Sequence, residues 1–247
     1  MSARNRIPAM KKGYKGIGME GFFASWYARN TGKSPGQYTG DAREVALHAP
    51  AGSAVLEVAP GPGYLLIELA KLGRYRAAGL DISRTFVAIA RENARDAGAD
   101  IEFLLGNASA MPFCADTFDF IICRAAFMDF SEPVKALREM RRVLKPGGTA
   151  LVVDLRRDAT KEAVDAEVEG LGLGWWDAMV TKWIFRYGLV PRAYTKEEFR
   201  RFIEEAGFRE YEIGERPIRF GIRLEKPPGA GKIAAAPASD RGRTGPE

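Results

Sequence analysis

Short apolar runs alternate with segments of helical spacing through the middle of the chain. Five apolar runs have the length of strands buried on both faces: residues 54–59, 76–80, 101–105, 118–123 and 149–155. Apolar residues recur every three or four positions in 64–72, 83–97 and 132–144, with Ser83 as a candidate N-cap. Strands that alternate with helices predict a parallel, doubly wound, Rossmann-like α/β sheet with helices on both faces.

The pattern changes on both sides of this alternating region. Residues 21–29 carry aromatic residues at helical spacing and predict a short amphipathic helix before the sheet. Thr195 and Glu198 form a capping-box pattern for a helix that ends near Ala206. Two further strands, 208–213 and 218–224, predict an antiparallel hairpin at the edge of a mostly parallel sheet of seven strands.

Residues 156–192 predict a long helical stretch rather than another strand unit. One face of it carries Trp176, Met179, Val180, Trp183, Ile184 and Tyr187. Three interpretations of this face stay open: packing on the sheet, a wall of an acceptor pocket, and a surface that faces lipid.

We expect one domain over residues 20–225, because 247 residues allow a single large domain. Residues 156–192 would form a helical lid or insertion in it. Residues 1–19 are predicted to be a flexible basic segment. Residues 226–247, rich in Pro, Gly and Ala, are predicted to be a disordered tail.

The formal charge of +5 is concentrated at the amino end. Residues 1–19 contain five basic residues and no acidic residue. Residues 20–225 carry a net charge of about −2, so the body lacks the basic face that nucleic-acid binding requires. We interpret the charged ends as solubilising and expect no nucleic-acid partner. No apolar run is long enough for a transmembrane helix, and no secretory signal precedes residue 20, which favours a cytoplasmic protein.

The cysteines and the histidine do not indicate a metal site, a disulfide or a hydrolase. Cys114 and Cys123 lack disulfide or metal-ligand spacing, so both are expected to be buried thiols and no metal site is predicted. His48 is the single histidine, and no acid or nucleophile near it in sequence suggests a Ser-His-Asp hydrolase.

The loop after the first strand is the best candidate for a binding site. It reads Glu57-Val58-Ala59-Pro60-Gly61-Pro62-Gly63-Tyr64, and ligands of doubly wound sheets bind at the carboxyl ends of the strands. Gly61 and Gly63 leave the backbone bare for close approach. A dinucleotide fingerprint would need a third small residue where Leu66 stands, so that interpretation fails.

This loop resembles the first motif of the class I S-adenosylmethionine-dependent methyltransferases, an acid followed by Gly-x-Gly-x-Gly. Glu57, Gly61 and Gly63 match, and Ala59 replaces the first glycine. Further segments resemble the family in the same order, in small-molecule enzymes of the methyltransferase domain 11 or 25 kind: 79–83, 106–113, 118–124 and 144–148. Together these segments span residues 55–155.

The resemblance implies S-adenosylmethionine as the cofactor. Asp81 would accept hydrogen bonds from both ribose hydroxyls, worth about 1.5–3 kcal/mol each. Asn107, where the family commonly has Asp, would accept from the adenine amino group. The implied cofactor-binding residues are Glu57, Ala59, Gly61, Gly63, Tyr64, Asp81, Ile82, Asn107, Ala108, Ser109 and Arg124.

The resemblance also implies transfer of a methyl group by in-line displacement to a small, partly apolar acceptor. The family's signature for methylating nucleic-acid amino groups is absent where Arg124-Ala125-Ala126-Phe127 stands, which favours a small molecule. No catalytic residue is assigned, although Asp129 and Asp154 near strand ends are candidate bases. The aromatic candidates for the acceptor pocket are Trp26, Tyr27, Phe127, Trp175, Trp176 and Trp183.

Three other functions stay open. The same fold can use this cofactor for cyclisation or aminopropyl chemistry. A noncatalytic, cofactor-binding partner subunit would also lack an identifiable base. A nicotinamide oxidoreductase is disfavoured by Leu66. The sequence does not predict an oligomeric state.

Overall fold

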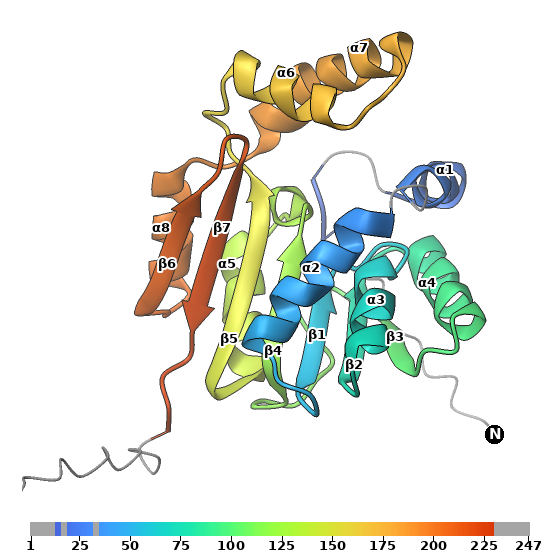
Figure 1. The fold of residues 1–247 in the computed structure, drawn as a ribbon. Helices are drawn as coiled ribbons and strands as arrows, with labels where there is room; N and C mark the ends of the chain where they lie inside the picture. The colour runs from blue at the N-terminus through green and yellow to red at the C-terminus, as the bar shows by residue number, and fades with distance from the viewer. Residues whose placement is uncertain (1–12, 16–18, 32–34, 230–247) are drawn as a thin grey trace, which may run out of the picture.

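A computed structural model of the chain describes residues 13–15, 19–31 and 35–229, and it contains a central sheet of seven strands (Figure 1). The strands are β1 (Ala54–Val58), β2 (Arg76–Asp81), β3 (Ile101–Leu105), β4 (Phe118–Arg124), β5 (Leu144–Leu155), β6 (Glu210–Glu215) and β7 (Arg219–Glu225). Their order is β3-β2-β1-β4-β5-β7-β6. The first five are parallel, and β7 is antiparallel to both β5 and β6. The predicted fold class and its edge hairpin are confirmed.

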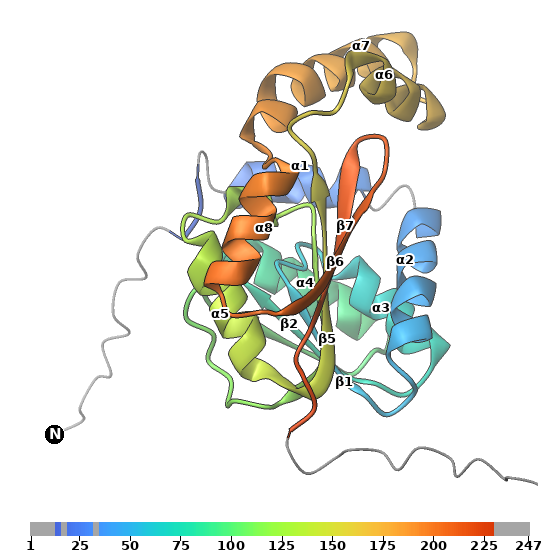
Figure 2. The ribbon, with the colours of Figure 1, turned by 90° about the vertical axis from the view of Figure 1, so that its left-hand side faces the viewer.

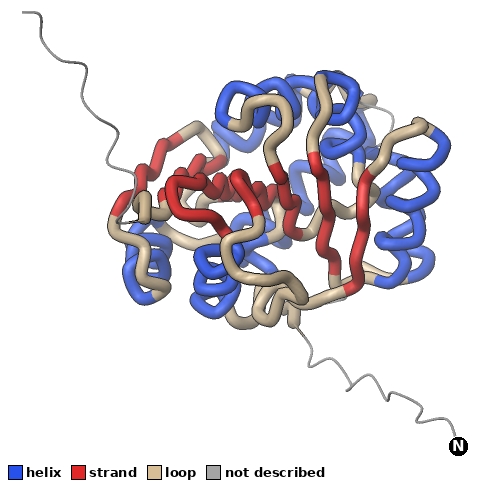
Figure 3. Tube along the Cα trace, turned by 90° about the horizontal axis from the view of Figure 1, so that it is seen from below, coloured by secondary structure: helices blue, strands red, loops and turns tan. Residues whose placement is uncertain are grey.

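Helices cover both faces of the sheet (Figures 2 and 3). One apolar core lies between the sheet and α2 (Pro35–His48), α3 (Tyr64–Leu72) and α4 (Arg84–Asp96). The other lies between the sheet and α5 (Pro133–Val143) and α8 (Lys196–Glu205). The strands of the parallel part are therefore buried on both sides, as their continuous apolar sequences require.

Local sequence signals place the helix starts where they were expected. The Ser83 hydroxyl accepts a hydrogen bond from the Phe86 backbone N–H at 3.1 Å and caps α4. Thr195 and Glu198 form a complete capping box at the start of α8. Helix α1 (Gly21–Thr31) also lies where the aromatic spacing predicted it.

The segment after β5 is a helical hairpin, not one long helix. It consists of α6 (Lys161–Gly170), α7 (Trp175–Trp183), the π-helical η2 (Ile184–Leu189) and the short 3-10 helix η3 (Val190–Arg192). Three glycines in the sequence Gly-Leu-Gly-Leu-Gly, at 170–174, separate α6 from α7. Figure 1 shows α6 and α7 beyond the carboxyl ends of the parallel strands.

Three other features differ from the expectations. Helix α2 was not predicted. Strand β5 begins at Leu144, directly after α5, because Leu144 pairs with Phe118 of β4. Cys123 is buried, but Cys114 is exposed, because it lies in the loop before β4 and not in the core. Most of the predicted flexible segment and tail lies outside the described residues. Among the described residues, no helix combines the length and apolar character needed to cross a membrane.

Candidate active site

The order of the parallel strands reverses at β1 and β4, which are neighbours in the sheet but not in sequence. In open α/β sheets the loops after two such strands diverge at their carboxyl ends, and ligands bind between them. The short 3-10 helix η1 (Phe127–Asp129) follows β4 at this edge. The candidate site therefore consists of the residues that follow β1, β2, β3 and β4.

The turn after β1 uses three left-handed residues. Gly61 has φ 53° with no atom within 4 Å of a Cβ added there, so it is bare toward open space. Gly63 has φ 80°, and an added Cβ would lie 2.7 Å from the Phe103 ring. Ala59 has φ 59°, which costs about 1–2 kcal/mol for a residue with a side chain. The backbone of the turn thus has the conformation that three glycines would favour, and it is strained at Ala59, which replaces the first of them.

Asp81 joins this turn to the end of β2. Its two carboxylate oxygens accept hydrogen bonds from the Gly61 N–H at 3.0 Å and from the Ser83 N–H at 2.8 Å. Burial raises the pKa of Asp81 to about 6, and these hydrogen bonds oppose the rise. Each oxygen retains a lone pair for a further donor.

Glu57 lies in β1 beneath the turn. It is buried, and its Oε2 atom has no hydrogen-bond partner among the described residues. Burial, and to a lesser extent the Asp81 carboxylate, raises the pKa of Glu57 to about 8. A buried acid without a partner is unfavourable, so this position is suited to a cationic or hydrogen-bond-donating ligand group.

An unpredicted segment, residues 13–15, lies against the end of β3; we call it the N-terminal strap. A Cβ added at Gly13 would lie 2.6 Å from Asn107 Nδ2 and 2.6 Å from Ile82 Cδ1. The Gly13 carbonyl accepts from the Ser131 N–H at 3.2 Å, and the Lys15 N–H donates to the Asp129 carbonyl at 2.7 Å. The predicted adenine-side residues thus lie next to the strap. Asn107 Oδ1 also accepts from the Ser109 N–H at 2.8 Å.

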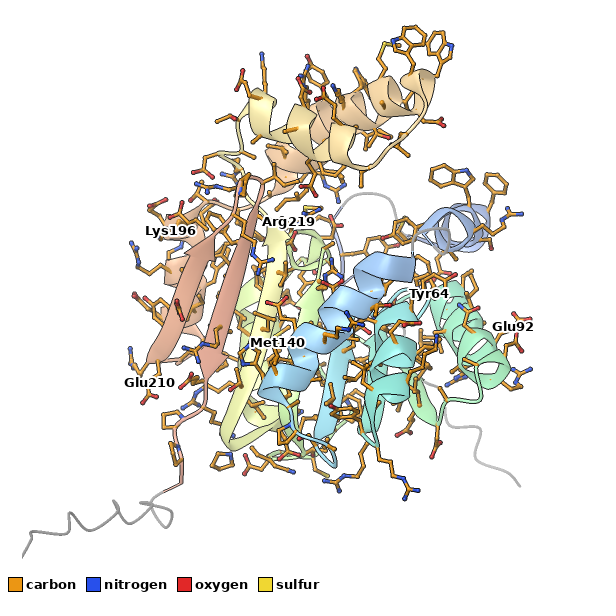
Figure 4. The ribbon with its side chains drawn as sticks, viewed as in Figure 1. Tyr64, Glu92, Met140, Lys196, Glu210 and Arg219 are labelled. Carbon is orange, nitrogen blue, oxygen red and sulfur yellow. The ribbon has the colours of Figure 1, made fainter. Side chains whose placement is uncertain are left out.

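Arg124, at the end of β4, forms an ion pair with Asp41 of α2. Burial, followed by the nearby Arg219, lowers the pKa of Arg124. Arg219 pairs with Glu167 of α6 at 2.6 Å, and Figure 4 shows Arg219 at the start of β7 next to the helical hairpin. Sequence reasoning identified Arg124 but neither its partner Asp41 nor the nearby Arg219, because both come from distant segments.

Both candidate bases are engaged in other contacts. Asp154 is buried and accepts from the Met128 N–H at 3.0 Å and from the Leu155 N–H at 2.7 Å, and burial raises its pKa to about 6. Asp129 forms an ion pair with Arg192, while burial raises its pKa. Asp154 thus fixes the start of η1, and Asp129 connects the end of η1 to η3.

The aromatic pocket candidates do not gather in one place. Phe127 is fully buried among Phe130, Tyr194 and Phe199, so its position is in the core and differs from the predicted pocket wall. The Tyr27 ring meets Phe86 edge-on at 5.9 Å. The other four are exposed: Trp26, Trp175, Trp176 and Trp183. Tyr64, labelled in Figure 4, donates its hydroxyl to the Ala28 carbonyl at 3.1 Å and so contacts α1.

His48, the histidine that a Ser-His-Asp hydrolase would need, lies at the opposite edge of the sheet. His48 lies parallel to the Phe120 ring at 6.3 Å, near the amino ends of the strands. Within 13–15, 19–31 and 35–229, no three potential ligands are grouped to hold a metal ion.

Comparison with known proteins identifies a family. Residues 56–152 match the family model described as "Methyltransferase domain". A demethylmenaquinone methyltransferase of Deinococcus radiodurans is 31% identical over 163 residues, 62% of this chain and 67% of that protein. The corresponding Chlorobaculum tepidum protein is 30% identical over 164 residues, 64% of this chain and 66% of that protein. A Klebsiella pneumoniae ubiquinone/menaquinone biosynthesis C-methyltransferase is 37% identical over 112 residues, 43% of this chain and 44% of that protein. The chain thus spans about two thirds of the first two relatives and under half of the third.

Solved structures agree on the fold. A candidate S-adenosylmethionine-dependent methyltransferase of Methanococcus maripaludis superposes with a TM-score of 0.68 at 21% identity, covering 91% of this chain and all of that one. The [4+2]-cyclase SpnF superposes with a TM-score of 0.59 at 20% identity, covering 90% of this chain and 88% of that one. At these identities the likeness concerns the fold alone.

Proposed function

The chain belongs to the class I S-adenosylmethionine-dependent methyltransferases, and from this premise we propose that it methylates a small aromatic acceptor of the quinone class. The family assignment makes the chain an enzyme with S-adenosylmethionine as its cofactor. The acceptor, the residues that bind each group and the course of the transfer are our proposals.

The residues at the carboxyl edge fit this cofactor. Asp81 is already oriented by two backbone N–H groups and keeps acceptor capacity for the ribose hydroxyls. Gly61 leaves open space where the backbone can approach a ligand. The partnerless Oε2 atom of Glu57 is suited to the cationic amino-acid end of the cofactor. The Glu57, Gly61 and Asp81 arrangement is the observation that carries the proposal.

When bound, S-adenosylmethionine supplies an activated methyl group on a sulfonium sulfur. We propose that this chain contributes mainly position, since orienting two reactants can supply roughly 7–11 kcal/mol. Asp129 and Asp154 are both held by structural contacts, so neither is assigned a proton-transfer role. The nucleophile would approach in line from the side of β4, where Arg124 and Asp41 lie.

Two observations favour a quinone-class acceptor. The relatives from Deinococcus and Chlorobaculum are named for demethylmenaquinone. In addition, α1 and α7 lie at the carboxyl edge and carry exposed aromatic side chains, so an apolar molecule would meet apolar surface on its way to the site. A reduced quinone would present an electron-rich ring to the methyl group.

Calorimetry with S-adenosylmethionine tests the cofactor site. We expect Asp81→Asn to weaken binding by roughly 10- to 100-fold, because a hydrogen bond to a charged group is lost. Asp96→Asn, at the exposed end of α4, is the matched control and should bind as the wild type does. Equal affinity of Asp81→Asn and wild type would refute the ribose assignment.

Product analysis tests the reaction. With cofactor carrying a deuterated methyl group and a reduced naphthoquinone, we expect S-adenosylhomocysteine, a proton released from the ring, and a methylated quinol that retains all the label. Methylthioadenosine as the product would overturn methyl transfer in favour of aminopropyl chemistry. Cofactor binding without turnover over a panel of reduced quinones would overturn the acceptor class and leave the cofactor site standing.

A further inference from the structure

The outward face of α7 and η2 is aromatic, whereas ion pairs join α7 and η2 to α6 on the other side, and only η2 turns apolar side chains, Phe185 and Leu189, toward the apolar cluster around Val164 of α6. Seven exposed residues lie on one side at helical spacing, and we call them the aromatic face: Trp175, Trp176, Met179, Val180, Trp183, Ile184 and Tyr187. On the other side, Lys182 Nζ lies 2.8 Å from Glu169 Oε1, and Arg186 pairs with Asp165. No residue of α7 is buried. Helix α7 thus leaves exposed the large apolar side chains that an ordinary surface helix turns inward.

Helix α1 adds aromatic side chains at the same edge of the sheet. Phe22 and Trp26 are exposed, and Figures 1 and 2 both show α1 near the carboxyl ends of the parallel strands, as they show α6 and α7 beyond them. All four tryptophans of the chain are therefore between 53% and 68% exposed. Tryptophan and tyrosine are the side chains that favour the boundary between hydrocarbon and water.

The sequence that leads into the N-terminal strap has the charge that an anionic surface attracts. The amino end, which continues into α1, carries Arg4, Arg6, Lys11, Lys12 and Lys15 with no acid up to residue 19. Lys12 directly precedes Gly13, which contacts Ile82 at the carboxyl edge. The acidic residues of α6 would repel an anionic surface only weakly, because three of them form ion pairs. These pairs are Asp165 with Arg186, Glu167 with Arg219, and Glu169 with Lys182.

We propose that the aromatic face and α1, together with the basic residues before α1, bind the surface of a bilayer that contains anionic phospholipid. The helices lie in the plane of the headgroups, the indole rings enter the boundary with the acyl chains, and the basic residues attract the lipid charge. Docking in this way holds the carboxyl edge, with Gly61 and Asp81, next to the membrane, from which an apolar quinone can be taken. This last consequence rests on the proposed function, but the docking itself does not.

Vesicle flotation of the full chain tests the docking without cofactor or acceptor. We expect at least tenfold tighter binding to phosphatidylcholine vesicles with roughly 30% phosphatidylglycerol than to phosphatidylcholine alone, with binding weakened by salt. Tryptophan emission should shift to shorter wavelength and be quenched by brominated acyl chains. Because all four tryptophans lie on the proposed surface, no core tryptophan obscures the change.

Substitutions distinguish the contribution of the tryptophan rings to vesicle binding from that of the basic residues. The double variant Trp176→Ser/Trp183→Ser should weaken binding at least tenfold, because two exposed rings that would enter the lipid are lost. Lys11→Gln/Lys12→Gln should weaken it about 25-fold at low salt and reduce the salt dependence. The control is Leu47→Ser, on an 83% exposed residue of α2 outside the surface, which should bind as the wild type does. Circular dichroism establishes that each variant is folded.

Three results would overturn the proposal. One is equal flotation of Trp176→Ser/Trp183→Ser and wild type, or no flotation at all. Another is a stable dimer in sedimentation that the same tryptophan variant dissociates, since a second copy would then cover the face. The third is a blue shift of tryptophan emission on adding cofactor and a water-soluble quinone without lipid, which would make the hairpin a lid. Calorimetric cofactor binding is measured separately, so failure of docking leaves the methyltransferase proposal intact.

Discussion

Glu57 is the residue whose protonation most directly connects the site to stability. Its pKa in the folded protein, about 8, lies above its ordinary value because the carboxyl group is buried. The folded state therefore holds a proton that the unfolded chain releases near pH 4.5. The stability linked to this proton is fully present below that pH and is lost as the pH rises through about 8. Asp81 and Asp154 act in the same direction up to about pH 6.

We therefore expect the ligand-free protein to lose stability between about pH 5 and pH 8, with the melting temperature falling by about 5–10 °C. Glu57→Gln keeps the shape of the side chain without the charge, so its melting temperature should change little between about pH 6.5 and pH 8. Differential scanning calorimetry over this range measures both. A wild-type melting temperature that rises with pH would contradict the direction assigned to Glu57.

At the residue scale, sequence motifs predicted the local part of the site. Gly61 and Gly63 are close in sequence, and the structure gives each a distinct reason: open space at one and contact with the Phe103 ring at the other. Asp81 reaches that turn from the next strand, as the motif order implied. The ion pair of Arg124 with Asp41 had no signal, because nothing in a single sequence relates residues 83 positions apart.

At the element scale, the N-terminal strap is the part of the site with the clearest steric limit. Gly13 contacts both Ile82 and Asn107, which the family resemblance associates with the adenosine end of the cofactor. Any larger residue would meet both side chains at 2.6 Å. Either the strap moves away or those two side chains shift.

We expect Gly13→Val to weaken S-adenosylmethionine binding by roughly tenfold, about 1.4 kcal/mol. The melting temperature should change little, because few backbone hydrogen bonds hold the strap. Gly36→Ala is the control, since no atom lies within 4 Å of a Cβ added there. Unchanged affinity in a folded Gly13→Val protein would show that the strap does not influence the cofactor site.

Two elements show what helical patterning predicts and what it does not. Helix α2 escaped prediction because its buried side is made of small side chains, Ala42 and Val45, and because Pro35 and Gly36 resemble a turn. The pattern of α7 did predict a helix, but it could not tell which side faces the protein. The side that faces α6 carries the ion pairs of Lys182 and Arg186, and Phe185 packs there with Val164, all of which are contacts with a different helix.

At the scale of the whole molecule, the alternation of strands and helices predicted the parallel part of the sheet correctly. The helices that cover these strands mostly come next to them in the sequence, so the pattern is local. The antiparallel hairpin β6–β7 was also predicted, from Gly214 and Pro217 between two short apolar runs. Its place at the edge of the sheet was predicted as well, but the order of its two strands was not: β7, the later strand, lies beside β5, and β6 is outermost. When two strands that pair are far apart in the sequence, their pairing is decided by the packing of the complete sheet.

The exposure of every tryptophan gives a prediction for unfolding. In lipid-free solution, tryptophan emission of the folded protein should lie at the long wavelength of indole in water and should shift little in urea. Far-ultraviolet circular dichroism should show the full cooperative transition in the same samples. A large red shift of emission on unfolding would mean that the aromatic face is covered in the folded protein, by a lid or by a second copy. The monomeric state of each sample is checked by sedimentation.

The strap also has a consequence for how the protein is made. Lys15 bonds to Tyr194, 179 positions later in the chain, and Gly13 bonds to Ser131. At a synthesis rate of roughly 5–20 residues per second, Lys15 is translated about 9–36 s before Tyr194. The contact between Lys15 and Tyr194 therefore forms only after most of the chain has been made, and this edge of the protein is completed late in its synthesis.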